Sequence, residues 1–354
     1  MKEFWSSRIQ NLVPYTPGEQ PKNQTFIKLN TNENPYPPSP KALAAIAANV
    51  NEDLKLYSDP EGTQLREAIA KVYQVKPSQV FVGNGSDEVL AFAFQAFFGV
   101  GDTIVFPDIT YSFYPVYANM FGIHCRTVPL REDFTMPVDQ LIGNNDGVVI
   151  TNPNAPTGIE LPQTELRRIL EGNPDVVVIV DEAYVDFGGT SALPLVEEYP
   201  NLLVVQTLSK SRALAGLRVG FAIGNENLIQ AVNCVKNSIN SYTLDRLALA
   251  GGAAAVEDVA YFQEHCAMVA LTRERVSDAL REMGFTVLPS KANFIFISHP
   301  VVPAKKLFGE LRKAGILVRY FDLPRIDNFL RVTIGTDPDM NTFLQVIKQL
   351  VSES

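Results

Sequence analysis

The feature that most constrains the fold is a series of six short apolar runs, separated mostly by segments of helix length. The runs lie at residues 80–82, 103–106, 147–150, 176–180, 202–205 and 219–223. Continuous apolar runs rich in β-branched residues predict strands buried on both faces, and helices between them predict a mostly parallel sheet. We therefore expect an α/β domain in which helices cover both faces of this sheet.

The chain outside this series predicts two further parts. The first 34 residues are rich in turn formers, which predicts an irregular N-terminal arm. After residue 225 the pattern changes to long helical segments and then to shorter elements. We expect helices within 228–258 and at 259–283, 303–314 and 337–351, and strands at 285–288, 293–297, 316–319 and 329–334. The predicted domains are an arm at 1–34, packed with the small domain and the substrate site, a large domain at 35–245 and a small α+β domain at 246–354.

Composition argues against several functional classes. A formal net charge of −9 without a basic tract argues against a nucleic-acid partner. The three cysteines, Cys125, Cys234 and Cys266, are far apart and show neither metal-ligand spacing nor a disulfide framework, which favours a reducing cytoplasm. No run approaches the ~20 apolar residues that a membrane span needs. We expect a cytoplasmic protein without a metal or a membrane partner.

Polar residues follow nearly every predicted strand, and parallel strands end at one edge of a sheet, where ligands bind. Gly85 and Ser86 form a turn into the next helix, where backbone amides and the helix dipole can bind an anion. A dinucleotide-binding turn would need glycine at position 88, where Glu88 stands. The turn therefore suits a single phosphate better than a dinucleotide. A third possibility is a simple tight turn that binds no ligand.

Lys210 follows the apolar run at 202–205, with Ser209 beside it and Arg218 eight residues later. A lysine screened by apolar neighbours can lose its proton near neutral pH and attack a carbonyl carbon. Serine and arginine can hold a phosphate. Pyridoxal phosphate is an aldehyde with a phosphate group, so its binding site needs both a reactive lysine and a phosphate-binding group. The alternative is that Lys210 is a solvated loop lysine.

Asp181 ends the run at 176–180 and is followed by Tyr184. A buried carboxylate needs a positive partner, and the pyridinium nitrogen of pyridoxal phosphate can be that partner. The alternative is an aspartate that caps the next helix. Tyr111 can stack on a planar cofactor, or it can be a core residue that covers the loop. Asn154 lies in a proline-rich loop. This loop can hold the asparagine amide towards the cofactor ring, or it can be an ordinary proline turn.

Two arginines, Arg319 and Arg331, fall in predicted strands of the small domain. The two-residue period of a strand places Arg331 and Thr333 on the face opposite Leu330 and Val332. An arginine there can bind a carboxylate or a phosphate through two parallel hydrogen bonds. The alternative is an arginine on the solvent face of a sheet.

The order of these motifs is more specific than any single one. It runs Gly85-Ser86-Asp87, Tyr111, Asn-Pro-Asn-Ala-Pro-Thr-Gly at 152–158, Asp-Glu-Ala-Tyr at 181–184, Thr-Leu-Ser-Lys at 207–210 and Ala-Gly-Leu-Arg-Val-Gly at 215–220. In this order the chain resembles the aminotransferases of the pyridoxal-phosphate superfamily called fold type I, and among them the histidinol-phosphate aminotransferases. The resemblance covers nearly the whole chain. It implies a large domain with a mostly parallel, seven-stranded sheet, a smaller domain and a homodimer with shared active sites.

The resemblance also implies roles for the site residues. Lys210 links covalently to the cofactor aldehyde and later moves a proton between the substrate and the cofactor. Arg331 takes the carboxylate or the phosphate of the substrate. The other cofactor residues are Asp181 at the ring nitrogen, Tyr184 and Asn154 at the ring oxygen, Tyr111 on the ring face, Gly85, Ser86, Asp87, Thr207, Ser209 and Arg218 around the phosphate, and Tyr57 from the second subunit. The other substrate residues are Tyr15, Asn34 and Arg319.

One position departs from the family pattern. Many relatives carry asparagine directly before Pro-Thr-Gly, and Ala155 stands there in this chain. The resemblance implies a transamination between L-histidinol phosphate and 2-oxoglutarate in histidine biosynthesis. The alternatives are an aromatic amino-acid aminotransferase, a phosphothreonine-type decarboxylase on the same fold, and a non-catalytic binding protein, which the presence of Lys210 disfavours.

Overall fold

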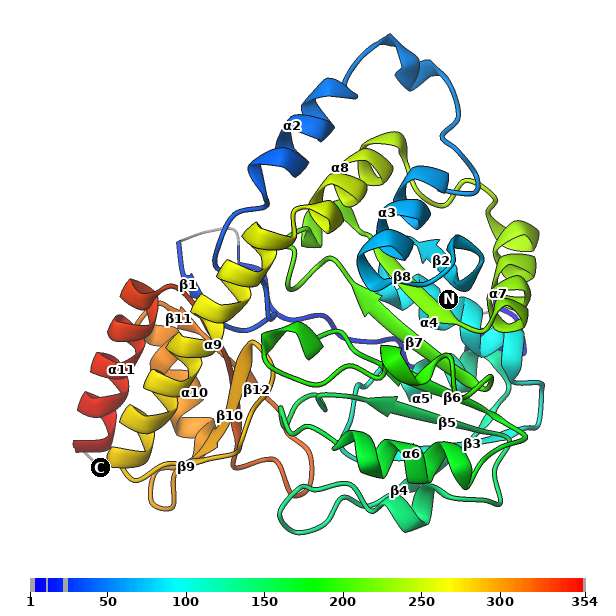
Figure 1. Cartoon of the computed structure of the whole chain (residues 1–354). Coiled ribbons are helices and arrows are strands. Elements are labelled where there is room, and N and C mark those ends of the chain that lie inside the picture. Colours follow the sequence, from blue (N-terminus) through cyan, green and yellow to red (C-terminus); the bar gives the residue numbers. More distant parts are fainter. Residues whose placement is uncertain (1–3, 11, 22–24, 353–354) are drawn as a thin grey trace.

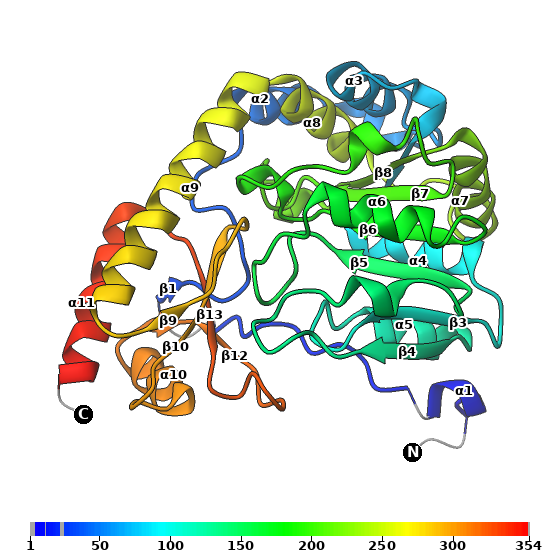
Figure 2. The ribbon, with the colours of Figure 1, turned by 60° about the horizontal axis from the view of Figure 1, so that its bottom comes forward.

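The structure is a computed structural model that describes residues 4–10, 12–21 and 25–352. Figure 1 shows a large domain and a small domain, and Figure 2 shows the long helix α9 (Val259–Glu282) beginning beside the large domain and continuing along the small one. Among the described residues, no helix is long and apolar enough to cross a membrane, and no group of three metal-ligating side chains is found.

A seven-stranded sheet forms the centre of the large domain, with the order β2-β8-β7-β6-β5-β3-β4. Its strands are β2 (Val80–Gly83), β3 (Thr103–Pro107), β4 (His124–Val128), β5 (Gly147–Thr151), β6 (Val177–Asp181), β7 (Leu202–Thr207) and β8 (Gly220–Gly224). Only β8 runs antiparallel to its neighbours β2 and β7. The six predicted strands are confirmed. Sequence reasoning missed β4, because this edge strand is mostly exposed and has no continuous apolar run.

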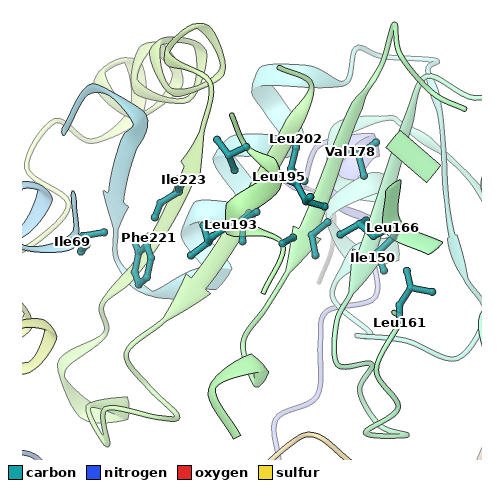
Figure 3. Packing of buried hydrophobic residues seen from close by; sticks show 14 of the residues in the cluster. Ile69, Ile150, Leu161, Leu166, Val178, Leu193, Leu195, Leu202, Phe221 and Ile223 are labelled. Carbon is teal, nitrogen blue, oxygen red and sulfur yellow. The ribbon is translucent and has the colours of Figure 1, made fainter. Parts of the chain in front are cut away.

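Helices cover both faces of this sheet. Alternate residues such as Ile150, Val178 and Leu202 point to one face, and Val149, Ile179 and Leu203 point to the other. Figure 3 shows how the first face is packed. The helices are α2 (Pro40–Ala48), α3 (Thr63–Tyr73), α4 (Gly85–Phe97), α5 (Tyr114–Phe121), α6 (Gln163–Glu171), α7 (Glu226–Ile239) and α8 (Arg246–Glu257). The continuous apolar runs are explained by burial from both sides.

The small domain combines helices with a four-stranded sheet of order β12-β13-β10-β9. Besides α9 it contains β9 (Thr286–Val287), β10 (Phe294–Ser298), α10 (Ala304–Lys313), β11 (Ile316–Leu317), β12 (Arg319–Tyr320), β13 (Leu330–Thr333) and α11 (Asp337–Ser352). The arm contributes α1 (Ser7–Gln10) and β1 (Ile27–Lys28), and β1 pairs in parallel with β11. Short 3₁₀ helices lie at Glu52–Lys55, Pro77–Gln79, Val138–Leu141, Val185–Phe187, Leu193–Leu195 and Ala215–Leu217.

The domain boundary at 245/246 stays a prediction. Helix α8 lies beyond it in sequence but packs against α2 and α3 of the large domain. Leu249 and Val256 of α8 belong to the same apolar cluster as the large-domain sheet. This packing favours a boundary between α8 and α9, near Asp258.

Candidate active site

A cavity opens where the carboxyl ends of the large-domain strands meet the arm and the small domain. The strand topology explains this meeting, because β2, β3, β5, β6 and β7 are parallel and end at one edge. Arg218 reaches the same edge because β8 runs in the opposite direction and begins there. The predicted residues that line the cavity are Tyr15, Ser86, Asp87, Tyr111, Asp181, Tyr184, Thr207, Ser209, Lys210, Arg218, Arg319 and Arg331.

Lys210 contributes an amine to the cavity. Its Nζ donates to the backbone oxygen of Thr31 at 3.1 Å and lies 5.9 Å from the ring centre of Tyr184. Burial, and then the positive charge of Arg331, lower the pKa of the Lys210 amine to about 8. The share of this amine that is neutral, and so nucleophilic, near neutral pH is therefore much larger than for an ordinary lysine.

Asp181 contributes a buried carboxylate at the end of β6, with 3% of its surface exposed. Oδ2 accepts a hydrogen bond from Tyr114 Oη at 3.0 Å, and Oδ1 accepts one from the backbone of Ala183 at 3.3 Å. Burial raises the pKa of this carboxyl to about 7, although the Tyr114 bond opposes the shift. No described cation forms an ion pair with Asp181. The site therefore suits a ligand that brings a protonated ring nitrogen.

The N-terminus of α4 and Arg218 form an anion cradle. Gly85 has φ of +81°, and a Cβ at this position would lie 2.5 Å from Nη2 of Arg218. Glycine therefore allows the guanidinium to approach the first turn of the helix, where amides have no partner within the helix. The guanidinium lies 3.3 Å from Oδ2 of Asp87, and both groups are partly exposed. Helix amides and a cation together suit a phosphate.

Two tyrosines, Tyr111 and Tyr184, line the cavity and use their hydroxyls in different contacts. Tyr111 donates through its hydroxyl to Oδ1 of Asp87 at 2.8 Å. The hydroxyl of Tyr184 accepts a hydrogen bond at 3.0 Å from Nδ2 of Asn32, which has φ of +56°. Sequence reasoning did not single out Asn32 as a site residue. Its position in an asparagine-rich loop was the available signal, because asparagine tolerates the left-handed conformation better than most residues.

The small domain contributes two arginines. Arg319 and Arg331 are register partners on β12 and β13. Arg331 Nη2 donates to the backbone oxygen of Asn30 at 3.0 Å, and its buried Nε has no hydrogen-bond partner among residues 4–10, 12–21 and 25–352. In the described part of the chain, neither arginine has a carboxylate partner. Tyr15 of the arm stacks on Phe113 at 4.3 Å and lines the same region. This side of the cavity can receive a second anion.

Four predicted residues, Gly85, Asn154, Asn34 and Tyr57, are not part of the cavity lining. Gly85 precedes Ser86 in the first turn of α4. The cofactor role of Asn154 stays a prediction. Its Nδ2 donates to Ile109 O at 3.0 Å and to Thr157 Oγ1 at 3.1 Å, and its buried Oδ1 has no hydrogen-bond partner among the described residues. The neighbouring Ala155 faces the cavity instead. Asn34 donates to the backbone oxygen of Lys210 at 3.0 Å and so supports the lysine, and its contact with a substrate stays a prediction. Tyr57 is 81% exposed, and its role in a second subunit stays a prediction.

Comparison with known proteins decides the family. A family model described as aminotransferase class I and II matches residues 24–347. The chain belongs to this family. As a class I and II aminotransferase it depends on pyridoxal phosphate. The cavity fits this cofactor, because an amine, an unpaired buried carboxylate and an anion cradle converge on it.

The aminotransferase is similar to curated relatives over its full length. It is 55% identical to a histidinol-phosphate aminotransferase of Clostridium acetobutylicum, over 99% of this chain and 100% of the relative. It is also 55% identical to one of Acinetobacter baumannii, over 98% of this chain and 97% of the relative. The fold is similar to the crystal structure of histidinol-phosphate aminotransferase from Sinorhizobium meliloti in complex with pyridoxal-5'-phosphate. The two chains are 24% identical with a TM-score of 0.90, and the similarity covers 99% of this chain and 98% of the other. This last similarity shows the fold.

Proposed function

We propose that this aminotransferase exchanges an amino group between L-histidinol phosphate and 2-oxoglutarate, giving imidazole acetol phosphate and L-glutamate in histidine biosynthesis. The full-length similarity to histidinol-phosphate aminotransferases supports the choice of substrate. The observation that carries it is the pair Arg319 and Arg331, which line the cavity with Lys210 and have no carboxylate partner among the described residues. A phosphate ester and a carboxylate are both ligands of arginine. One receptor therefore serves both half-reactions.

The cavity residues hold the cofactor and move one proton. When bound, pyridoxal phosphate withdraws electrons from the substrate carbon that bears the amine. The carboxylate of Asp181 would hold the protonated ring nitrogen, and the hydroxyl of Tyr184 would donate to the ring oxygen. Nζ of Lys210 would accept the proton from the amine-bearing carbon of the substrate and hold it for return. Ser86, Ser209 and Arg218 would bind the phosphate.

Support for the proposed homodimer comes from the surface around Tyr57. The ring of Tyr57 stacks on Tyr242 with centres 4.6 Å apart, and Leu54 and Leu56 beside it are more than half exposed. Neighbouring exposed apolar side chains are typical of an interface. We propose that this face contacts a second copy of the chain, whose phosphate cradle then receives Tyr57.

A second candidate is an aromatic amino-acid aminotransferase. Tyr15, Tyr111 and Phe113 lie together at the cavity, and such rings suit a phenyl group as well as an imidazole. The carboxylate of phenylalanine would occupy the same arginines. The rings alone therefore do not discriminate between the two donors.

Steady-state kinetics with identified products test the proposal. With 2-oxoglutarate as acceptor, kcat/KM is expected to be higher for L-histidinol phosphate than for L-phenylalanine, with L-glutamate formed and no carbon dioxide released. A preference for phenylalanine would favour the aromatic alternative, and release of carbon dioxide would identify a decarboxylase. The Lys210→Ala variant is expected to be inactive and to lack the visible absorption of the lysine–cofactor bond. Unchanged absorption in this variant would contradict the role of Lys210.

A further inference from the structure

The loop between β12 and β13, residues 321–329, crosses from the small domain to the large one. Arg325 at its tip makes forked contacts. Nη1 lies 3.2 Å from Oδ2 of Asp108, and Nη2 donates to the backbone oxygens of Leu130 at 2.7 Å and Arg131 at 2.8 Å. One guanidinium thus binds two separate segments of the large domain.

Apolar packing supports the same contact. Ile326 is 2% exposed and belongs to the apolar cluster that contains Leu130 and Phe134 of the large domain. The guanidinium carbon of Arg325 lies 5.7 Å from the ring centre of Phe134. We call Arg325 and Ile326 together the domain clamp. A half-exposed ion pair alone would contribute little, but the clamp adds two charge-assisted backbone bonds and a buried side chain.

Backbone conformation marks both sides of the clamp. Arg325 has φ of +70° and Phe134 has φ of +63°, a region that residues with bulky side chains rarely occupy. Such conformations persist where the surrounding contacts fix them, and they cluster at functional sites. The contacts of the domain clamp fix the backbone in this conformation at both Arg325 and Phe134.

The position of the clamp connects the two walls of the active site. Arg319 and Arg331 lie on the strands at the two ends of the clamp loop. Asp108 directly follows β3, and Tyr111 follows three residues later. The clamp therefore ties the hairpin that carries the anion receptor to the strand end that carries Tyr111.

We propose that Arg325 is a positioning residue, which holds Arg319 and Arg331 at the correct place opposite Tyr111 and Lys210. Arg325 itself does not line the cavity. The identity of the anionic substrate in this inference rests on the proposed function. Other contacts between the domains remain when Arg325 is replaced, including Lys291 N to Gly158 O at 2.9 Å and Arg273 Nη1 to Phe187 O at 2.8 Å. The Arg325→Ala variant should therefore fold.

Kinetics of Arg325→Ala test the proposal, with Arg281→Ala as the matched control, because Arg281 forms an exposed ion pair with Asp278 within α9. Arg325→Ala is expected to raise KM for both L-histidinol phosphate and 2-oxoglutarate by about tenfold, with kcat within about twofold of wild type. The visible absorption of the lysine–cofactor bond stays unchanged. Amide hydrogen exchange in residues 129–134 becomes faster, and Arg281→Ala changes none of these values.

A second measurement separates the clamp from the choice of substrate. In the cofactor-loaded enzyme the cofactor phosphate fills the cradle at α4, so inorganic phosphate added in calorimetry reports on the arginine pair. Weaker phosphate binding in Arg325→Ala supports the clamp even if the wild-type enzyme does not use L-histidinol phosphate. Unchanged phosphate binding and unchanged KM would overturn the proposal. A variant that loses kcat or cofactor absorption, with KM unchanged, would overturn it as well.

Discussion

Lys210 and Asp181 show opposite pKa shifts with the same physical cause. Burial disfavours the charged form of each, so the pKa of the amine falls to about 8 and that of the carboxyl rises to about 7. Neither shift requires a direct contact between the two groups. Bound pyridoxal phosphate would relieve both effects, because Lys210 would supply its neutral amine to the aldehyde and Asp181 would pair with the ring nitrogen. Residue chemistry thus explains why this cavity suits pyridoxal phosphate.

The lowered pKa of Lys210 predicts how cofactor loading depends on pH. Only the neutral amine attacks the aldehyde, and its fraction rises about tenfold per pH unit below 8 and then levels off. Stopped-flow absorption of cofactor-free enzyme mixed with pyridoxal phosphate, between pH 6 and 9, measures the rate. We expect the rate to rise and level off near pH 8. A rate that falls as pH rises through this range would contradict the shift.

Asp181 and its neighbour Glu182 provide a matched pair for mutation. Both are buried, and burial raises the pKa of each carboxyl to about 7. Only Asp181 faces the cavity, since Glu182 accepts hydrogen bonds from Ser191, Ala192 and Gln206. Asp181→Asn is expected to lower kcat by about a hundredfold or more, because the ring nitrogen loses its charge partner.

Glu182→Gln is expected to lower thermal stability with little effect on kcat. Equal losses of kcat in the two variants would contradict the assignment of Asp181.

The raised pKa of Asp181 also predicts how the stability of the cofactor-free protein depends on pH. Protonated Asp181 contributes its full share of the free energy of unfolding below pH ~3.9, the pKa in the unfolded chain. This contribution is lost as pH rises through about 7, the pKa in the folded protein. Thermal melts of cofactor-free Asp181→Asn should therefore show a weaker fall in stability over this range than wild type.

At the scale of elements, the apolar runs were sufficient to predict the strands and where they end. They were insufficient for β4, because an exposed edge strand leaves no apolar run. The spacing of Lys210 and Arg218 indicated a phosphate site, but their convergence depends on β8 running antiparallel, which local sequence does not reveal. The role that the resemblance gives Asn154 stays a prediction. Its Nδ2 donates to the backbone oxygen of Ile109, in the loop after β3, and this tertiary contact was not evident from the motif.

The anion cradle at α4 predicts a specific effect of Gly85→Ala. The new methyl group would meet Arg218, and the positive φ adds backbone strain of about 1 kcal/mol or more. Gly101→Ala is the control, because Gly101 has φ of +94° with no atom within 4 Å of a new Cβ. Both variants are expected to lose stability in thermal melts. Only Gly85→Ala is expected to bind pyridoxal phosphate about tenfold more weakly, and equal affinity in the two variants would contradict the cradle.

At the scale of the whole molecule, the cavity is a meeting point of parts that are distant in sequence. Strand ends of the large domain supply the residues predicted to bind the cofactor, the small domain supplies Arg319 and Arg331, and the arm supplies Tyr15. Sequence order and resemblance predicted this meeting. They did not predict the domain clamp, because Arg325 lies in a loop without a motif and its partners depend on tertiary packing.

The proposed dimer makes a prediction about assembly and affinity together. We expect sedimentation velocity to show a dimer for the wild-type enzyme and a monomer for the double variant Leu54→Glu, Leu56→Glu, because two charges would be buried in the interface. The monomer is expected to bind pyridoxal phosphate about tenfold more weakly, since it lacks the Tyr57 of a second copy. Val100→Glu, at an exposed apolar residue elsewhere, serves as control. A wild-type monomer with full activity would contradict the shared site.

The most direct measurement is a single-turnover reaction of the cofactor-loaded enzyme with L-histidinol phosphate, in the absence of 2-oxoglutarate. We expect stoichiometric loss of the visible absorption of the lysine–cofactor bond, faster than with L-phenylalanine at equal concentration, and its recovery when 2-oxoglutarate is added. Absorption that does not respond to L-histidinol phosphate, or that responds faster to L-phenylalanine, would contradict the proposed function.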